Sequence, residues 1–316
     1  MAQIALHDLL ERLALDADAL GVDADNPFPF RLHSNLAARI QPGNPKDPIL
    51  RQVLPLKIER QPVEGFTADP VGDLAARPAP GVLHKYHGRA LVMRTPRCDL
   101  HCRFCFRRHF PYEENIGQAA WQQTLDYLRT HADIHEVILS GGDPLTLSEA
   151  ALLETCQALE ALPHVHTLRI HTRTPIAAPS RMPKHDWLTW ARRSRLKLVL
   201  VSHCNHPQEL SEQTAAVFQT LRKTGVTLLN QSVLLRGVND TGTTLEQLSH
   251  ALFQQGVLPY YLHQLDPVAG AAHFAVDDAT ARGLIDYLRR RLPGYLVPRL
   301  VREIPGEASK TPVEAP

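Results

Sequence analysis

Six strand-then-helix units follow one another along most of this chain, and they limit its fold more than any other feature. The expected strands are aliphatic and β-branched runs at 89–95, 136–140, 166–171, 197–202, 226–233 and 259–264. Each is followed by a helical pattern, near 116–131, 147–162, 184–194, 207–224, 243–256 and 277–291. Regular alternation favours parallel strands joined by right-handed crossovers. Because a full (β/α)8 barrel needs two more units, we expect an α/β fold of the partial (β/α)6 barrel type.

The N-terminal part of the chain lacks this alternation. Apolar residues at helical spacing predict an amphipathic helix from Ile4 to about Leu20. Residues 24–80 then carry many prolines with short helical pieces such as 46–53, which is typical of an irregular arm laid on a main domain. The sequence therefore predicts three parts: a helical and proline-rich arm at 1–80, the barrel at 81–292 and a C-terminal segment at 293–316.

Charge and cysteine content narrow the function class. The formal net charge of +1 gives no basic footprint of the kind that binds nucleic acid or anionic membranes. No apolar run reaches the ~18 residues of a transmembrane helix, and the first residues lack the basic start and apolar core of a leader peptide. Five cysteines are an odd number, which fits a reducing compartment better than a disulfide framework. We expect a cytoplasmic protein without nucleic-acid or membrane partners.

Three cysteines, Cys98, Cys102 and Cys105, lie within eight residues directly after the first expected barrel strand. The loops that follow barrel strands are where such folds place their chemistry. A structural zinc ion normally takes four protein ligands, whereas a [4Fe-4S] cluster held by three cysteines keeps its fourth iron open. The spacing therefore favours a cluster. The alternative is a zinc knuckle that takes His101 or His109 as its fourth ligand.

Polar residues also follow the other expected strands. Gly141 and Gly142 let the backbone approach a ligand closely, and Asp143 beside them can accept a hydrogen bond from an ammonium group. A tight turn before a helix would have the same sequence. His203 ends the fourth strand and Gln231 lies in the fifth. Since burying a polar group without a partner is costly, each either finds a partner inside the barrel or meets a ligand.

Two motifs resemble those of a known enzyme superfamily. The CxxxCxxC motif, with an aromatic residue before its last cysteine, resembles the signature of the radical S-adenosylmethionine enzymes, and Ser140–Asp143 resembles the loop that holds the methionine amino group there. Residues 44–312 as a whole resemble the lysine 2,3-aminomutases, in particular their short bacterial form that works with elongation factor P. The blocks that carry this resemblance are 84–89, 98–110, 140–143, 168–175, 230–240, 266–274 and 309–312.

The resemblance implies roles for particular residues. Lys310 matches the lysine that forms a Schiff base with pyridoxal phosphate. Three residues, Tyr86, Arg89 and Lys85, would hold the pyridoxal ring and phosphate, with Lys85 standing where other members carry arginine. Arg107 matches the arginine that pairs with the substrate carboxylate, for which a guanidinium fork is well suited. Two acidic residues that bind the far amino group of lysine are matched by Asp266 and Glu303, where Glu303 replaces an aspartate.

The resemblance also implies a reaction. A reduced cluster on the three cysteines would cleave S-adenosylmethionine, and the resulting radical would take hydrogen from C3 of lysine before the amino group moves from C2 to C3. The implied product is (R)-β-lysine, which a separate ligase attaches to elongation factor P, and an electron donor such as flavodoxin or ferredoxin is required.

Three alternatives stay open. An aminomutase acting on arginine or glutamate would share the cysteines and Lys310, although Asp266 and Glu303 would repel the distal carboxylate of glutamate. A radical enzyme without pyridoxal phosphate would leave Lys310 exposed to solvent. A zinc-bearing binding module would use the three cysteines structurally.

Overall fold

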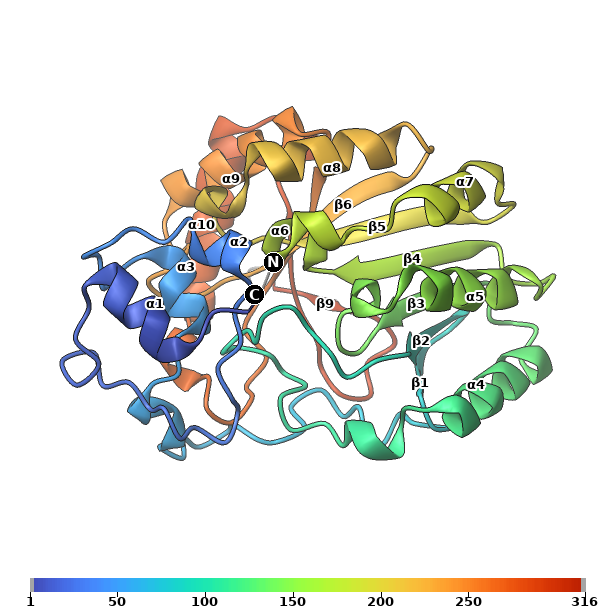
Figure 1. The fold of residues 1–316 in the computed structure, drawn as a ribbon, viewed down its shortest axis with the longest axis horizontal. Coiled ribbons are helices and arrows are strands. Elements are labelled where there is room, and N and C mark those ends of the chain that lie inside the picture. Colours follow the sequence, from blue (N-terminus) through green and yellow to red (C-terminus); the bar gives the residue numbers. More distant parts are fainter. Residues whose placement is uncertain (1–2, 314–316) are drawn as a thin grey trace.

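The computed structural model describes residues 3–313. In this part of the chain a nine-stranded sheet follows the order of the sequence from β1 to β9 (Figure 1). Seven strands are parallel: β2 (Arg89–Met93), β3 (Glu136–Ser140), β4 (Thr167–Thr172), β5 (Lys197–His203), β6 (Thr227–Val233), β7 (Leu258–His263) and β8 (Arg299–Arg302). Two antiparallel strands, β1 (Val82–Tyr86) and β9 (Thr311–Pro312), form its edges.

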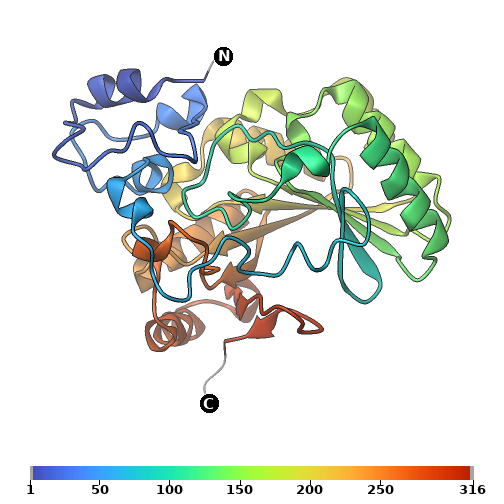
Figure 2. The same cartoon turned by 90° about the horizontal axis from the view of Figure 1, so that it is seen from below.

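Six long helices connect the parallel strands and cover the outside of the sheet (Figures 1 and 2). They are α4 (Gln118–Thr130), α5 (Glu149–Glu160), α7 (His185–Arg193), α8 (Glu212–Arg222), α9 (Gly242–Gln254) and α10 (Asp278–Arg291). Four of them begin at a side-chain cap that accepts a backbone N–H of the first turn, from Ser148, Ser211, Thr241 and Asp277. The predicted partial barrel is confirmed, and all six predicted strands and helices are present.

Shorter helices lie in the arm and in the loops. The short α-helices are α1 (Leu6–Leu13), α2 (Ser34–Ala37), α3 (Pro48–Val53) and α6 (Thr174–Ala177). Single 3-10 turns occur at Lys57–Arg60, Tyr112–Glu114, Pro144–Thr146, Pro179–Arg181, Pro207–Glu209, Ala272–Phe274 and Gly294–Leu296. No helix within residues 3–313 is long and apolar enough to cross a membrane.

The structure differs from the sequence-based prediction at the first helix and at the end of the sheet. The helix predicted from Ile4 to Leu20 ends at Leu13, because Ala14 adopts a left-handed conformation with φ 52° and stops the run of helical hydrogen bonds. The C-terminal segment adds β8 and β9 to the sheet, and neither strand was predicted. Six expected parallel strands therefore become seven.

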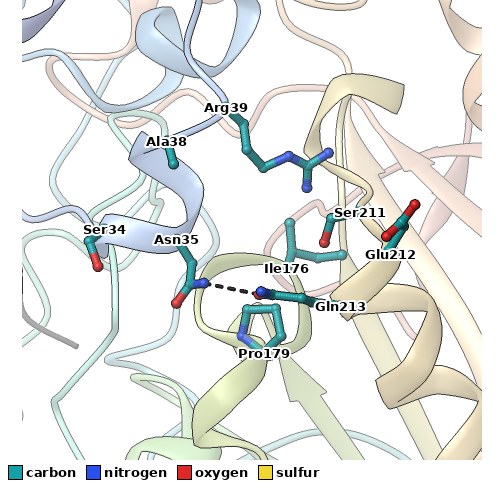
Figure 3. A pocket seen from close by; sticks show the side chains of 9 residues that line it. All are labelled: Ser34, Asn35, Ala38, Arg39, Ile176, Pro179, Ser211, Glu212 and Gln213. Carbon is teal, nitrogen blue, oxygen red and sulfur yellow. Dashed lines mark hydrogen bonds between the residues drawn. The ribbon is translucent and has the colours of Figure 1, made fainter.

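The arm packs against the barrel and shares its core. Leu9 and Leu13 of α1 are fully buried in the same apolar cluster as the sheet residues Val92 and Leu139. Where α2 meets the start of α8, the side-chain amide of Asn35 donates to the Gln213 side chain at 3.0 Å (Figure 3). Next to this contact the Arg39 guanidinium donates to the carbonyl groups of Glu209 and Leu210. These contacts fix the arm to the helical side of the barrel.

Candidate active site

A cavity of about 430 Å³ inside the barrel brings most of the predicted site residues together. Its lining includes eleven of them: Lys85, Tyr86, Arg89, Cys102, Cys105, Arg107, His203, Gln231, Asp266, Glu303 and Lys310. The other four, Cys98, Gly141, Gly142 and Asp143, are not part of the lining. Residues more than 200 positions apart in the sequence, two cysteines and Lys310 among them, thus line one cavity.

The cysteine loop follows β2 and is held in place by the arm. Arg103, inside the CxxxCxxC motif, is fully buried and pairs with Glu59, with its Nη2 2.5 Å from Oε2. Arg108, just beyond the motif, reaches the same carboxylate oxygen at 2.9 Å. Because a buried carboxylate with two guanidinium partners is well compensated, Glu59 fixes the second half of the loop. Nothing in the sequence near Glu59 indicated this role.

The surroundings of Cys102 fit a ligand of an anionic iron–sulfur cluster. Arg173 Nη1 lies 2.8 Å from Cys102 Sγ, and a guanidinium beside a thiolate ligand stabilises its negative charge. The same guanidinium is held by Glu209 at 2.7 Å and by Gln52 at 2.6 Å. Arg173 was not among the predicted site residues, although it lies directly after β4, at a position where barrel folds place functional groups.

The zinc alternative receives no support from the two candidate histidines. His101 Nδ1 lies 2.8 Å from the Pro29 carbonyl, and its ring stacks on Phe28. His109 Nε2 lies 3.3 Å from the carbonyl of Ala269. Within residues 3–313, no three His, Cys, Asp or Glu side chains converge on a point suited to a single metal ion.

The glycine pair after β3 packs directly against the cysteine loop. A Cβ on Gly142 would lie 2.5 Å from the Arg97 carbonyl oxygen, so only glycine fits there. We expected Asp143 to accept a hydrogen bond from a ligand, but it is not part of the cavity lining. Its carboxylate accepts hydrogen bonds from the Thr172 hydroxyl at 2.7 Å and from the backbone N–H groups of Arg173 and Thr174 at 2.7 and 2.9 Å. These donors satisfy a fully buried carboxylate, which ties the end of β3 to the end of β4.

Unpaired imidazole nitrogens face the cavity. His203 Nε2 has no hydrogen-bond partner among the described residues, and its ring packs against Phe104 with 5.6 Å between centroids. Burial lowers the pKa of His203 to about 3, so the imidazole is neutral. His171 also has an unpartnered Nε2, and burial holds its pKa and that of His263 well below the usual range. The latter two histidines were missed, and only their positions near strand ends could have indicated them.

At the other end of the cavity, Glu303 lies between two lysines. Its Oε2 is 2.6 Å from Lys310 Nζ, and its Oε1 is 2.7 Å from Lys85 Nζ. Burial alone would raise the pKa of Glu303, but the two ammonium groups outweigh burial and lower it to about 2. For Asp266 burial prevails over the nearby Lys310, and its pKa rises to about 7. One carboxylate is therefore firmly ionised, and the other titrates near neutral pH.

Comparison with known proteins identifies the family of this chain. Residues 92–188 match the model of the radical SAM superfamily. The chain is 47% identical over 311 residues to an L-lysine 2,3-aminomutase from Escherichia coli (strain K12), covering 97% of this chain and 90% of that protein. The chain belongs to the lysine 2,3-aminomutase family. Another member, from Haemophilus influenzae, is 45% identical over 96% of this chain and 90% of its own length. A third, from Clostridium subterminale, is 35% identical over 87% of this chain and 66% of its own length.

Solved structures show the same fold at low sequence identity. SuiB from Streptococcus suis matches 70% of this chain and 50% of its own with a TM-score of 0.50 and 16% identity. A radical SAM methyltransferase from Sphaerobacter thermophilus matches 70% and 68% with a TM-score of 0.50 and 15% identity. As a lysine 2,3-aminomutase family member, the chain is an isomerase of the radical SAM type, and that type implies a [4Fe-4S] cluster and S-adenosylmethionine.

Proposed function

We propose that this chain is a pyridoxal phosphate-dependent L-lysine 2,3-aminomutase that converts L-α-lysine to (R)-β-lysine. The observation that carries the proposal is the shared cavity: Cys102 and Cys105 line it together with Lys310. A radical generated at the cysteines and a substrate held near the lysine would then be close enough to react without leaving the enclosed space. The relatives named L-lysine 2,3-aminomutase support the same activity.

Cluster and S-adenosylmethionine would occupy the end of the cavity at the cysteine loop. In this proposal Cys98, Cys102 and Cys105 are the cluster ligands. His203 and Gln231 line the cavity beside them and would contact S-adenosylmethionine. Gly141 and Gly142 shape the loop that lets it approach, and Asp143 holds this loop to β4 through its buried hydrogen bonds.

Pyridoxal phosphate would occupy the end of the cavity at Lys310. The fit is supported by an amine, an aromatic side chain and a cation in the lining of the cavity: Lys310, Tyr86 and Arg89. The guanidinium of Arg89 lies over the Tyr86 ring at 4.9 Å and has no carboxylate partner among the described residues, so it is available for a phosphate. When bound, pyridoxal phosphate supplies the conjugated ring system that allows an amino group to move between neighbouring carbons.

The chain's own charged groups would orient the amino acid. Arg107 offers its terminal nitrogens to the carboxylate, and Asp266 with Glu303 provides negative charge for the far ammonium group. Two carboxylates at that end disfavour glutamate, whose distal group is negative. Lys310 lies inside the cavity with 23% of its side chain exposed and paired with Glu303. That placement favours a cofactor lysine over the surface lysine expected of an enzyme without pyridoxal phosphate.

We further propose that the product serves the modification of elongation factor P by a separate ligase, that flavodoxin or ferredoxin supplies the electron, and that the protein works in the cytoplasm. These proposals rest on the resemblance to the short bacterial form. We also keep the division into arm (1–80), barrel (81–292) and cofactor-bearing segment (293–316) as a proposal.

The test is an anaerobic incubation of the reconstituted protein with S-adenosylmethionine, pyridoxal phosphate, reductant and one amino acid at a time. With L-lysine we expect β-lysine by mass spectrometry, and with L-glutamate no β-amino acid. A faster conversion of arginine than of lysine would move the proposal to the arginine enzyme. Stoichiometric zinc without iron or labile sulfide would contradict it altogether.

A further inference from the structure

Five charged side chains form a continuous ion chain across the open side of the barrel. Their order is Arg107, Asp73, Lys85, Glu303 and Lys310. The successive contacts measure 2.6, 2.5, 2.7 and 2.6 Å. Lys85 belongs to the edge strand β1, and Lys310 directly precedes the edge strand β9. The ion chain therefore joins the two edges of a sheet that no strand pairing closes within the described residues. Cations and carboxylates alternate along it, and each carboxylate is shared by two cations.

Asp73 is the member of the ion chain that comes from the arm. It is 2% exposed, and its backbone N–H donates to the Asp69 side chain at 2.8 Å, which fixes the turn that presents it. Gly72 beside it has φ +67°, and a Cβ there would lie 3.2 Å from Pro305, so this turn packs against the C-terminal segment. Burial would raise the pKa of Asp73, but Arg107 and Lys85 together lower it. The carboxylate is therefore ionised and rigidly placed.

Protein oxygens surround the Lys85 ammonium: two of its donors make hydrogen bonds, and Asp73 Oδ1 lies in ion-pair contact with it. A lysine ammonium carries three N–H donors. The nitrogen of Lys85 lies 2.7 Å from the Val71 carbonyl, 2.5 Å from Asp73 Oδ1 and 2.7 Å from Glu303 Oε1. We had expected Lys85 to hold the pyridoxal phosphate group, but in this arrangement it links the arm to the C-terminal segment.

Arg107 differs from Lys85 because it keeps donors that face the cavity. Its Nε lies 2.6 Å from Asp73 Oδ2, and its Nη1 is 3.5 Å from the Ser140 hydroxyl. The guanidinium is planar, so holding Nε on one side sets the direction of the two terminal nitrogens. A substrate carboxylate needs both of them in one plane to bind as a fork. Without Asp73 the guanidinium would be free to rotate or to approach Glu303.

We propose that Asp73 is a positioning residue that orients Arg107 for the substrate carboxylate and keeps Lys85 in the ion chain. The inference rests on the proposed function, in which Arg107 binds that carboxylate. It assigns to the proline-rich arm a share in substrate recognition that its sequence does not indicate. Asp73 acts through Arg107 and makes no contact with the reacting atoms.

The test compares the D73N variant with the parental holoenzyme. Asparagine keeps the size of the side chain and removes its charge, so the guanidinium loses its fixed direction. We expect the KM for L-lysine to rise about tenfold or more, while kcat at saturating lysine stays within about threefold, the pattern of lost substrate binding. Calorimetry with L-lysine and holoenzyme lacking S-adenosylmethionine should show affinity weakened by a similar factor, without any turnover.

The matched control is E246Q. Arg291 Nε lies 2.6 Å from Glu246 Oε2, the same kind of contact at the same distance, but between α10 and α9 and outside the cavity lining. This variant should keep the parental KM and kcat. If D73N does not fold, D73E keeps the charge and displaces it by about one bond, and it should raise KM by about threefold with folding intact.

The outcomes separate the two claims. A D73N protein with parental KM and lysine affinity would overturn the assignment, and so would a fall in kcat and thermal stability at unchanged KM, because that pattern means a structural role only. If the parental protein with a complete cluster and bound pyridoxal phosphate formed no β-lysine, the proposed function itself would fail, and the role of Asp73 with it.

Discussion

The Nζ of Lys310 lies 2.6 Å from Oε2 of Glu303, which pairs the proposed cofactor lysine with a carboxylate proposed to bind substrate. The two residues are seven positions apart, one directly after β8 and the other directly before β9, so the short loop between these strands places them together. Because the pKa of Glu303 is lowered to about 2, its carboxylate is ionised at every physiological pH. Both members line the cavity that also holds the cysteines.

Replacing Lys310 separates the two ends of the site. We expect K310A to lose β-lysine formation by about 10³-fold or more, the scale on which removal of an essential reacting group acts. Iron, sulfide and reductive cleavage of S-adenosylmethionine should stay at parental values, because the cysteine loop does not depend on Lys310. K223A, at an exposed position after α8, is the control and should behave like the parent. Lysine turnover at the parental rate in K310A would rule out its assigned role.

Replacing Cys102 tests the ligand set. We expect C102A to lose the intact cluster, and with it both β-lysine and 5'-deoxyadenosine, because two cysteines cannot hold the cubane. Iron and labile sulfide analysis with the visible absorption spectrum measures this directly. C156A removes a buried thiol of α5 that lies outside the cysteine motif and the cavity lining, and it should retain full iron content. A normal cluster in C102A would show that another residue is the ligand.

Asp266 predicts a pH dependence of substrate capture. Its pKa is raised to about 7, so its carboxylate is charged above that pH and becomes protonated as the pH falls through it. Since an ammonium group binds the charged form, kcat/KM for lysine should fall about tenfold per unit below pH 7. D266N has no such titration, and its profile should lose this acid limb while its kcat/KM is low throughout. An unchanged acid limb in D266N would assign the titration to another group.

Gly142 predicts a steric effect near the cysteine loop. In G142A the new Cβ would lie 2.5 Å from the Arg97 carbonyl oxygen, so the loop that carries residue 142 must move away from the cysteine loop. We expect a destabilisation of about 1–3 kcal/mol with weaker S-adenosylmethionine binding. Gly283 in α10 has nothing within 4 Å of its added Cβ, and G283A should gain about 0.5–1 kcal/mol. Thermal unfolding measures the stability of both variants, and calorimetry measures their affinity for S-adenosylmethionine. Equal stability of both variants would contradict the packing described for Gly142.

Features set by nearby residues could be predicted from the sequence, and features set by distant partners could not. The cysteine motif and the strand-helix units are local patterns, and the structure contains them as expected. β8 was missed because the four residues Arg299–Arg302 are too few to show a strand pattern, and their place in the sheet depends on pairing with β7.

The arm residues show most clearly which contacts could not be predicted from the sequence. Glu59 reaches Arg103 across 44 positions, and Asp73 reaches Arg107 across 34, so no local pattern marks either acid as part of the site. Asp143 shows the opposite case. Its neighbours made it a candidate for a ligand contact, but donors from β4 and the following loop occupy its carboxylate.

The most direct test of the shared cavity follows one hydrogen atom. The reconstituted protein is incubated anaerobically with S-adenosylmethionine, pyridoxal phosphate, reductant and L-lysine deuterated at C3, and the products are analysed by mass spectrometry. The account predicts β-lysine together with deuterium in 5'-deoxyadenosine. The radical formed from S-adenosylmethionine at the cysteine loop must reach the substrate held near Lys310. Unlabelled 5'-deoxyadenosine with no β-lysine, from protein with a complete cluster and bound pyridoxal phosphate, would contradict it.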